Sequence, residues 1–193
     1  MKTSLPPSLF SVVGFTLVTL AAYACWAFGG NFLGSPIALY LACTLVFLGL
    51  GSLSLYPMVA ETTSRKRFLA TYIIGFLGYA IGWCAFWMLL HNKAGEWIGS
   101  LVGLLAMTLS FRLGIQRPPR FLLPFFLLFL FHNLGYFAGE QIHLALRHSH
   151  TALARLGWGF AHGLGFAVGL TALLHRAGRH QTVPVSASAE TPR

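Results

Sequence analysis

Six continuous apolar segments, each about as long as a bilayer's hydrocarbon core is thick, most constrain how this chain folds. A helix needs roughly 20 apolar residues to cross that core. The segments are Leu9–Phe28, Pro36–Ala60, Phe68–Leu90, Trp97–Ile115, Phe121–Leu144 and Leu153–Leu174. They do not alternate with the period of two that barrel strands require. The sequence therefore predicts an all-α, polytopic membrane bundle of six transmembrane helices.

The charge content supports this class. Only 9 % of the 193 residues are charged, against about a quarter in soluble domains. The net charge is +9, but the basic residues form short clusters between the apolar segments, where they set membrane topology. We expect them to contact anionic lipid head groups and expect no nucleic-acid partner.

The positions of Lys and Arg predict an orientation, because cytoplasmic loops carry an excess of both. With the N-terminus inside, ten of the thirteen fall on the inner side: Lys2, Arg65, Lys66, Arg67, Arg112, Arg117, Arg120, Arg176, Arg179 and Arg193. Lys93, Arg147 and Arg155 fall outside. We predict that both termini are cytoplasmic and that the protein lies in a cell membrane, as a multi-pass protein of the bacterial inner membrane.

The composition divides the chain into a long apolar part and a short polar tail. Residues 1–175 form the predicted six-span domain, and the polar residues 176–193 are typical of a disordered cytoplasmic tail. One alternative concerns the first segment, where Ala22, Tyr23 and Ala24 resemble a signal-peptidase cleavage site. Cleavage there would leave five spans and the same topology, although the apolar segment continues to Phe28.

Polar residues concentrate in the last two segments. His132, Tyr136, Glu140, His143 and Arg147 follow one another at spacings of four, four, three and four. They therefore share a narrow face of one helix. Intramembrane ionisable residues tend to mark function, so we expect this face to meet other helices or a wet cavity.

The sixth segment offers a partner for this face. His162 and Arg155 share a face there, and His162 lies at about the depth of His132 near the midplane. We predict a site between the fifth and sixth helices, with His132, Tyr136, Glu140, His162 and Arg155 as solute or proton-path residues. The competing interpretation is that these groups make hydrogen bonds that only fix helix packing.

Histidine and carboxylate side chains also raise the question of a metal. The metal-ligand candidates are His132, His162, Glu140, His143, His148 and His150, and a divalent ion would suit them. The alternative for the last three is a set of interfacial histidines in a short connection. The cofactor is otherwise unknown, and Cys25, Cys43 and Cys84 stand alone in apolar segments.

Glycines are spaced for close helix packing in the sixth segment. Gly159 with Gly163, and Gly165 with Gly169, form GxxxG pairs that allow helix backbones to approach. They predict packing inside the bundle, or docking of another membrane protein or of a second copy of the chain.

Two local resemblances involve the same helix. The stretch AHGLGFAVG at residues 161–169 resembles the last helix of rhomboid-type serine proteases, but GSLVG at 99–103 is not their GxSG nucleophile motif. The stretch FAHGLGFA at 160–167 resembles a helix of hydrogenase/urease accessory membrane proteins, a family linked to nickel or cobalt uptake. That family's signature requires an Asp, and this chain has none. Neither resemblance implies membership.

Three function classes remain open. The leading prediction is a small transporter or permease subunit for an ion or small solute. The second is a membrane-embedded enzyme that uses a metal or its histidines on a lipid or redox substrate, so enzymatic activity is left uncertain. The third is an accessory subunit of a membrane complex.

Overall fold

A computed structural model describes residues 6–115 and 121–178 as six α-helices and two short 3-10 turns, with no strand in these ranges. Each helix is long and apolar enough to cross a membrane, which confirms the all-α, six-span fold and a multi-pass membrane protein. The helices are α1 Pro7–Phe28, α2 Pro36–Leu55, α3 Arg65–Leu90, α4 Lys93–Gly114, α5 Leu122–Leu146 and α6 Thr151–Gly178. Most of the predicted tail, residues 179–193, and the connector 116–120 lie outside the described residues.

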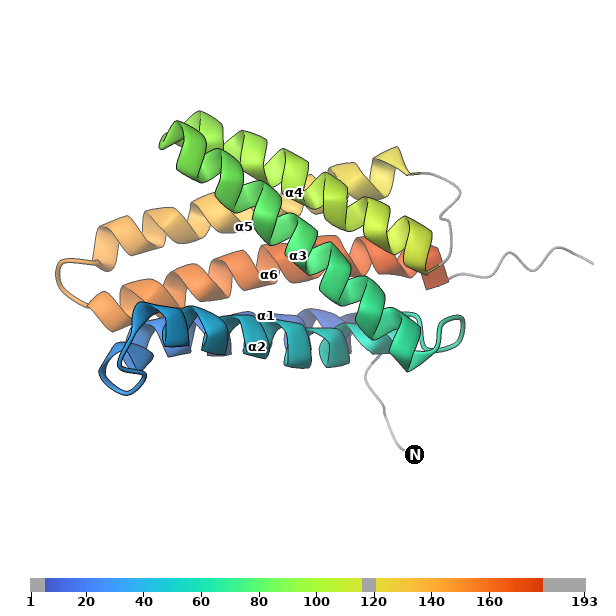
Figure 1. Ribbon diagram of the computed structural model, residues 1–193, viewed down its shortest axis with the longest axis horizontal. Coiled ribbons are helices and arrows are strands. Elements are labelled where there is room, and N and C mark those ends of the chain that lie inside the picture. The colour runs from blue at the N-terminus through green and yellow to red at the C-terminus, as the bar shows by residue number, and fades with distance from the viewer. Residues whose placement is uncertain (1–5, 116–120, 179–193) are drawn as a thin grey trace, which may run out of the picture.

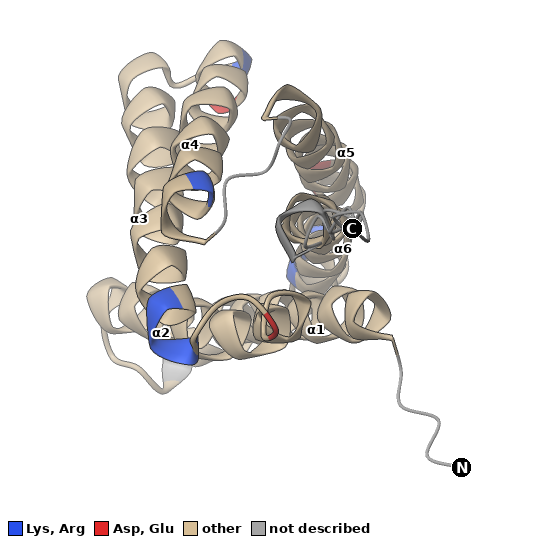
Figure 2. Cartoon of the chain, turned by 90° about the vertical axis from the view of Figure 1, so that its right-hand side faces the viewer, with Lys and Arg blue, Asp and Glu red and all other residues tan. Residues whose placement is uncertain are grey.

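The helices pack as three sequence-adjacent pairs, and α6 also packs against α1 (Figure 1). We call the end where α1 begins and α6 ends the terminal end, and Figure 2 looks onto it. The opposite, far end carries the loops 29–35, 91–92 and 147–150. α6 is the most enclosed helix, with half of its most apolar window buried against 17 % for α2 and for α3.

Local sequence explains where the helices begin and end. Ser35, Ser64 and Asn92 cap α2, α3 and α4, because each side chain accepts a hydrogen bond from a backbone N–H three residues on. Because of the cap at Asn92, α4 begins at Lys93, four residues before the predicted start at Trp97. In α2 the helix ends at Leu55 rather than the predicted Ala60. Pro57 lies in the 3-10 turn that follows, because its ring cannot continue an α-helix.

The glycine pairs of α6 pack inside the chain. A Cβ added at Gly159 or Gly163 would lie 2.5 or 2.7 Å from side-chain atoms of α1. One added at Gly165 or Gly169 would lie 2.3 or 2.9 Å from the backbone of α5. A partner that docks on either row would therefore have to displace one of these helices.

An aromatic core supports the middle of the bundle from the terminal side. Phe166 of α6 is buried there, with ring centroids 5.6 Å from Phe15, 5.2 Å from Tyr79 and 4.8 Å from His132. Since Phe166 contacts rings from α1, α3 and α5, it fixes the position of His162, which lies one turn before it in α6.

Candidate functional site

The two midspan histidines form one contact. His132 is fully buried in α5, and its Nε2 lies 3.2 Å from Nε2 of His162 in α6. The ring centroids are 5.0 Å apart and the rings stand at 86°. The backbones approach closely beside them, since a Cβ added at Gly135 would lie 2.5 Å from the carbonyl oxygen of Ala161. This is the contact expected from the similar depth of the two histidines.

Three hydroxyl groups extend this contact to three further helices. Tyr79 of α3 lies 2.8 Å from Nε2 of His132, and Ser100 of α4 lies 3.2 Å from its Nδ1. Tyr23 of α1 lies 3.2 Å from Nδ1 of His162. We call these five residues the histidine network; only α2 contributes no member.

The network has two ways to place its protons. A neutral imidazole carries N–H on one nitrogen and a lone pair on the other. In one arrangement Tyr23 donates to His162, His162 donates to His132, and His132 donates to Ser100. In the other, Ser100 donates to His132, His132 to His162, and His162 to Tyr23. The first arrangement converts into the second when Tyr23 takes up one proton, Ser100 releases one, and each group between them passes its own proton on, which is the behaviour of a proton relay.

One end of the network borders a cavity of about 350 Å³ in the far half of the bundle. Its walls come from α1, α2, α3, α5 and α6 and include no charged side chain. The largest wall residues are Trp26, Trp83, Trp158, Tyr23, Tyr40 and Tyr136. Because Tyr23 belongs to both, this aromatic cavity and the histidine network are directly connected.

Tyr136 belongs to the cavity wall rather than to the network. Its ring centroid is 5.5 Å from that of His162, and the residue is 8 % exposed. The described residues offer its hydroxyl no hydrogen-bond partner. Tyr136 is therefore a largely buried residue whose hydroxyl can bond a molecule other than the protein.

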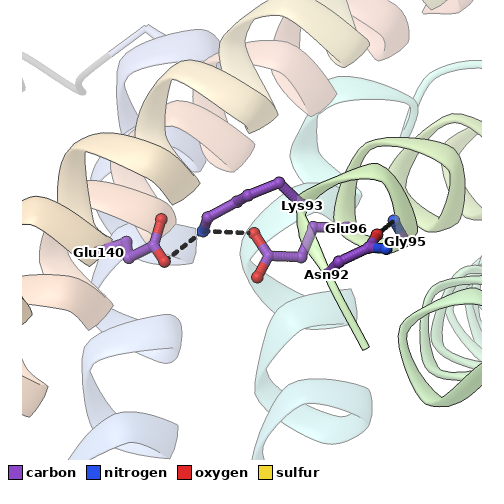
Figure 3. A network of polar contacts seen from close by, with 5 residues as sticks. All are labelled: Asn92, Lys93, Gly95, Glu96 and Glu140. Atoms are coloured by element: carbon purple, nitrogen blue, oxygen red, sulfur yellow. Dashed lines mark hydrogen bonds and ion pairs between the residues drawn. The ribbon is translucent and has the colours of Figure 1, made fainter. Parts of the chain in front are cut away.

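Glu140 lies apart from the histidines. Lys93, at the start of α4, binds both Glu96 and Glu140, with 2.8 Å between its Nζ and the Glu96 carboxylate (Figure 3). The Lys93 side chain is 58 % exposed. This part of the polar face of α5 therefore holds α4 against α5 at the far end.

Arg155 and His143 lie behind the cavity wall, around Trp26. Nη1 of Arg155 donates to the Trp26 carbonyl oxygen at 2.9 Å, and the guanidinium lies 4.5 Å from the Trp26 ring centroid. His143 stacks on the same ring at 6.0 Å. Both residues thus hold Trp26 in place rather than contacting the histidine network.

The last two candidate histidines, His148 and His150, are exposed in the far-end loop, where Arg147 donates to His148 at 3.2 Å. The six metal-ligand candidates therefore separate into the His132–His162 pair, Glu140 with Lys93, His143 with Trp26, and the two loop histidines. Across residues 6–115 and 121–178, no three His, Cys, Asp or Glu side chains converge as a metal site would need.

Sequence reasoning identified the two histidines but not Tyr23, Tyr79 or Ser100 as their partners. Each of the three is an isolated polar residue in an apolar helix other than α5 and α6. Their positions in the sequence do not indicate that they meet the histidines, because this depends on which helices lie side by side in the bundle. No protein-family model, no curated protein and no solved structure matches the chain.

Proposed function

We propose that the protein is a small transporter or permease subunit in which the histidine network exchanges a proton with a solute in the aromatic cavity. One observation carries the proposal: Tyr23 lines the cavity, and its hydroxyl lies 3.2 Å from Nδ1 of His162. A solute that donates to or accepts from Tyr23 would favour one of the two proton arrangements. Solute binding and proton position would thereby be coupled.

The surroundings of the histidines favour proton exchange that is coupled to solute binding over a histidine pair that stays positively charged. Burying a charge without a partner is costly, and the nearest carboxylates, Glu96 and Glu140, are already bound to Lys93. The pair would therefore take up a proton mainly when the solute or Tyr23 delivers it. Proton movement would then follow solute occupancy.

The orientation and the membrane belong to the same proposal. The excess of Lys and Arg at the terminal end supports cytoplasmic termini, and Figure 2 shows the basic cluster that begins α3 at this end. With that orientation the aromatic cavity lies in the outer half of the bilayer. A bacterial inner membrane fits a chain of this kind.

Purified protein in liposomes loaded with a pH-sensitive dye tests the proposal. External Zn²⁺, Ni²⁺, small organic acids and amines are added in turn. A short-chain quinone is added together with dithionite, which supplies the electrons that a quinone needs to take up protons. We expect at least one probe to change internal pH, and His162→Gln to reduce that rate at least tenfold. His148→Gln, in the exposed loop, is the matched control and keeps the wild-type rate. A wild type that responds to none of these probes contradicts the proposal.

A second candidate function is a membrane-embedded enzyme, favoured by the 3.2 Å contact between Ser100 and His132. A hydroxyl beside an imidazole is the arrangement of an activated nucleophile. Against it, Ser100 is 1 % exposed and does not line the aromatic cavity. Labelling by a fluorophosphonate that is lost in Ser100→Ala would establish this activity.

A metal- or cofactor-dependent enzyme needs a separate measurement. Elemental analysis and a visible spectrum of purified protein, compared with a His132→Ala/His162→Ala variant, decide it. A stoichiometric metal or chromophore that the variant lacks would move the balance toward metal or redox chemistry.

A further inference from the structure

We infer that the aromatic cavity binds a flat, uncharged, lipid-soluble ring bearing carbonyl oxygens, as in a quinone head group. This inference rests on the proposed function, because it names the class of solute that the same cavity takes. Four properties of the cavity lead to this class: its size, its unpaired hydrogen-bonding groups, its lack of charge and its opening.

Size and wall chemistry favour a ring compound. A volume of about 350 Å³ is at the small end of the range for pockets that enclose organic ligands. Trp83 packs on Tyr136 at 5.9 Å, and Tyr136 packs on Trp158 at 5.5 Å, each pair edge to face. Such walls contact a flat ring over a large area and with favourable aromatic geometry.

Unpaired polar groups in the wall call for a ligand that accepts hydrogen bonds. Tyr136 is more than nine-tenths buried, and its hydroxyl has no partner in the described part of the chain. The indole Nε1 of Trp158 also lacks a partner, but protein atoms enclose it away from the cavity. An unpaired hydroxyl in this wall costs free energy, and a carbonyl oxygen would accept a hydrogen bond from it. A hydrocarbon or a quaternary ammonium group offers no acceptor.

The cavity also selects against charge. None of its wall residues is charged, so a charged ligand would lose its hydration without compensation. A cation meets a further obstacle, because the Arg155 guanidinium already lies against the Trp26 ring.

The opening of the cavity faces the hydrocarbon region. α2 packs far less on α3 than on α1, and two of its contacts with α3 lie around Phe47. The Tyr72 hydroxyl donates to the Phe47 carbonyl oxygen at 3.0 Å, and the Phe47 and Phe76 ring centroids are 5.2 Å apart. Figure 1 shows α3 crossing α2 obliquely and leaving it toward the far end. Tyr40, at the rim, is 71 % exposed, so a ligand dissolved in the bilayer can enter between α2 and α3.

Titration with decylubiquinone, for protein in lipid nanodiscs, tests the inference. Three of the five tryptophans line the cavity, so we expect saturable quenching of tryptophan fluorescence. Tyr136→Phe removes one hydrogen bond and should weaken binding about 3- to 10-fold. Tyr56→Phe removes a hydroxyl in the turn after α2, outside the cavity wall, and should leave affinity within about twofold of wild type.

A second readout does not depend on fluorescence. Cys43 also lines the cavity, and in a Cys25→Ser/Cys84→Ser background it is the remaining thiol. We expect decylubiquinone to slow its alkylation by N-ethylmaleimide at least threefold. Decylbenzene, which has a similar tail but no carbonyl oxygens, should give less than a third of this protection.

The contradicting outcomes are distinct. If decylbenzene protects equally and Tyr136→Phe has no effect, the occupant is a hydrocarbon chain and the inference is wrong. Absence of saturable quenching and of Cys43 protection in wild type also overturns it. Binding is measured without a pH gradient, so quinone binding with no histidine-dependent proton flux rejects only the proposed proton exchange. Histidine-dependent flux with another probe, in protein that does not bind the quinone, rejects only this inference.

Discussion

His132 and His162, on different helices and 30 residues apart, share a hydrogen bond between their Nε2 atoms at 3.2 Å. The remaining nitrogen of each ring also has a hydroxyl partner, Ser100 for His132 and Tyr23 for His162. All four ring nitrogens are therefore engaged inside the bundle. Removing His132 leaves Nε2 of His162 without a partner, whereas removing His162 leaves Nε2 of His132 its contact with the Tyr79 hydroxyl.

This pairing predicts an energetic coupling between the two side chains. His132→Ala and His162→Ala should each lower the free energy of unfolding by about 1–3 kcal/mol, since buried partners lose their hydrogen bonds. The double variant should lose less than the sum, by about 0.6–1.7 kcal/mol, the range for hydrogen bonds between membrane helices. Denaturant titration in bicelles measures the free energy of unfolding for the wild type and the three variants. Strictly additive losses would contradict the contact.

The α5–α6 contact predicts a large effect from one methyl group. A Cβ at Gly165 would lie 2.3 Å from the Phe131 carbonyl oxygen, so Gly165→Ala should destabilise the protein by about 1–3 kcal/mol. Gly49→Ala is the matched control, because nothing lies within 4 Å of its added Cβ and Ala favours the helix. Equal thermal stability of the two variants would show that α5 and α6 are not packed this closely.

The Lys93–Glu140 ion pair predicts a small, salt-dependent contribution. Lys93 is more than half exposed, so Glu140→Gln should lower stability by less than about 1 kcal/mol at low salt. The loss should vanish near 1 M salt, where charges are screened over about 3 Å. Glu61→Gln is the control, because no ion pair in the described ranges includes Glu61. A loss that persists in high salt would mean that Glu140 acts through packing instead.

The orientation is testable with single cysteines placed in a background without Cys25, Cys43 and Cys84. In intact cells, a membrane-impermeant maleimide should label Ser149→Cys in the far-end loop. It should label Glu61→Cys, between α2 and α3, only after the membrane is permeabilised. The reverse pattern would place the termini outside and the aromatic cavity in the inner half of the bilayer.

The spans were predictable because helix length and apolar content are properties of a local segment. α2 ends earlier than predicted because Pro57 interrupts the helix, although the sequence stays apolar on both sides of it. The His132–His162 contact followed from depth along two neighbouring helices.

The rest of the site depends on tertiary packing. Glu140 shares a helix face with His132 but lies eight residues further along α5, or about 12 Å. It therefore meets Lys93 instead of the histidines. Ser100 reaches His132 because α4 packs beside α5 at that depth, and Tyr79 reaches it through its long side chain from α3, which packs on α4. No spacing in the sequence specifies either arrangement.

The packing of α1 against α6 has a consequence for the biogenesis of the protein. 139 residues separate Tyr23 from His162, so at about 5–20 residues per second the ribosome adds His162 roughly 7–28 s after Tyr23. During that interval α1 can pair with α2, but the side of α1 that faces α6 in the finished bundle has no helix against it. The hydrogen bond to Tyr23 thus forms among the last contacts of the bundle, and a nascent chain halted before α6 exposes an incomplete α1 surface to membrane quality control.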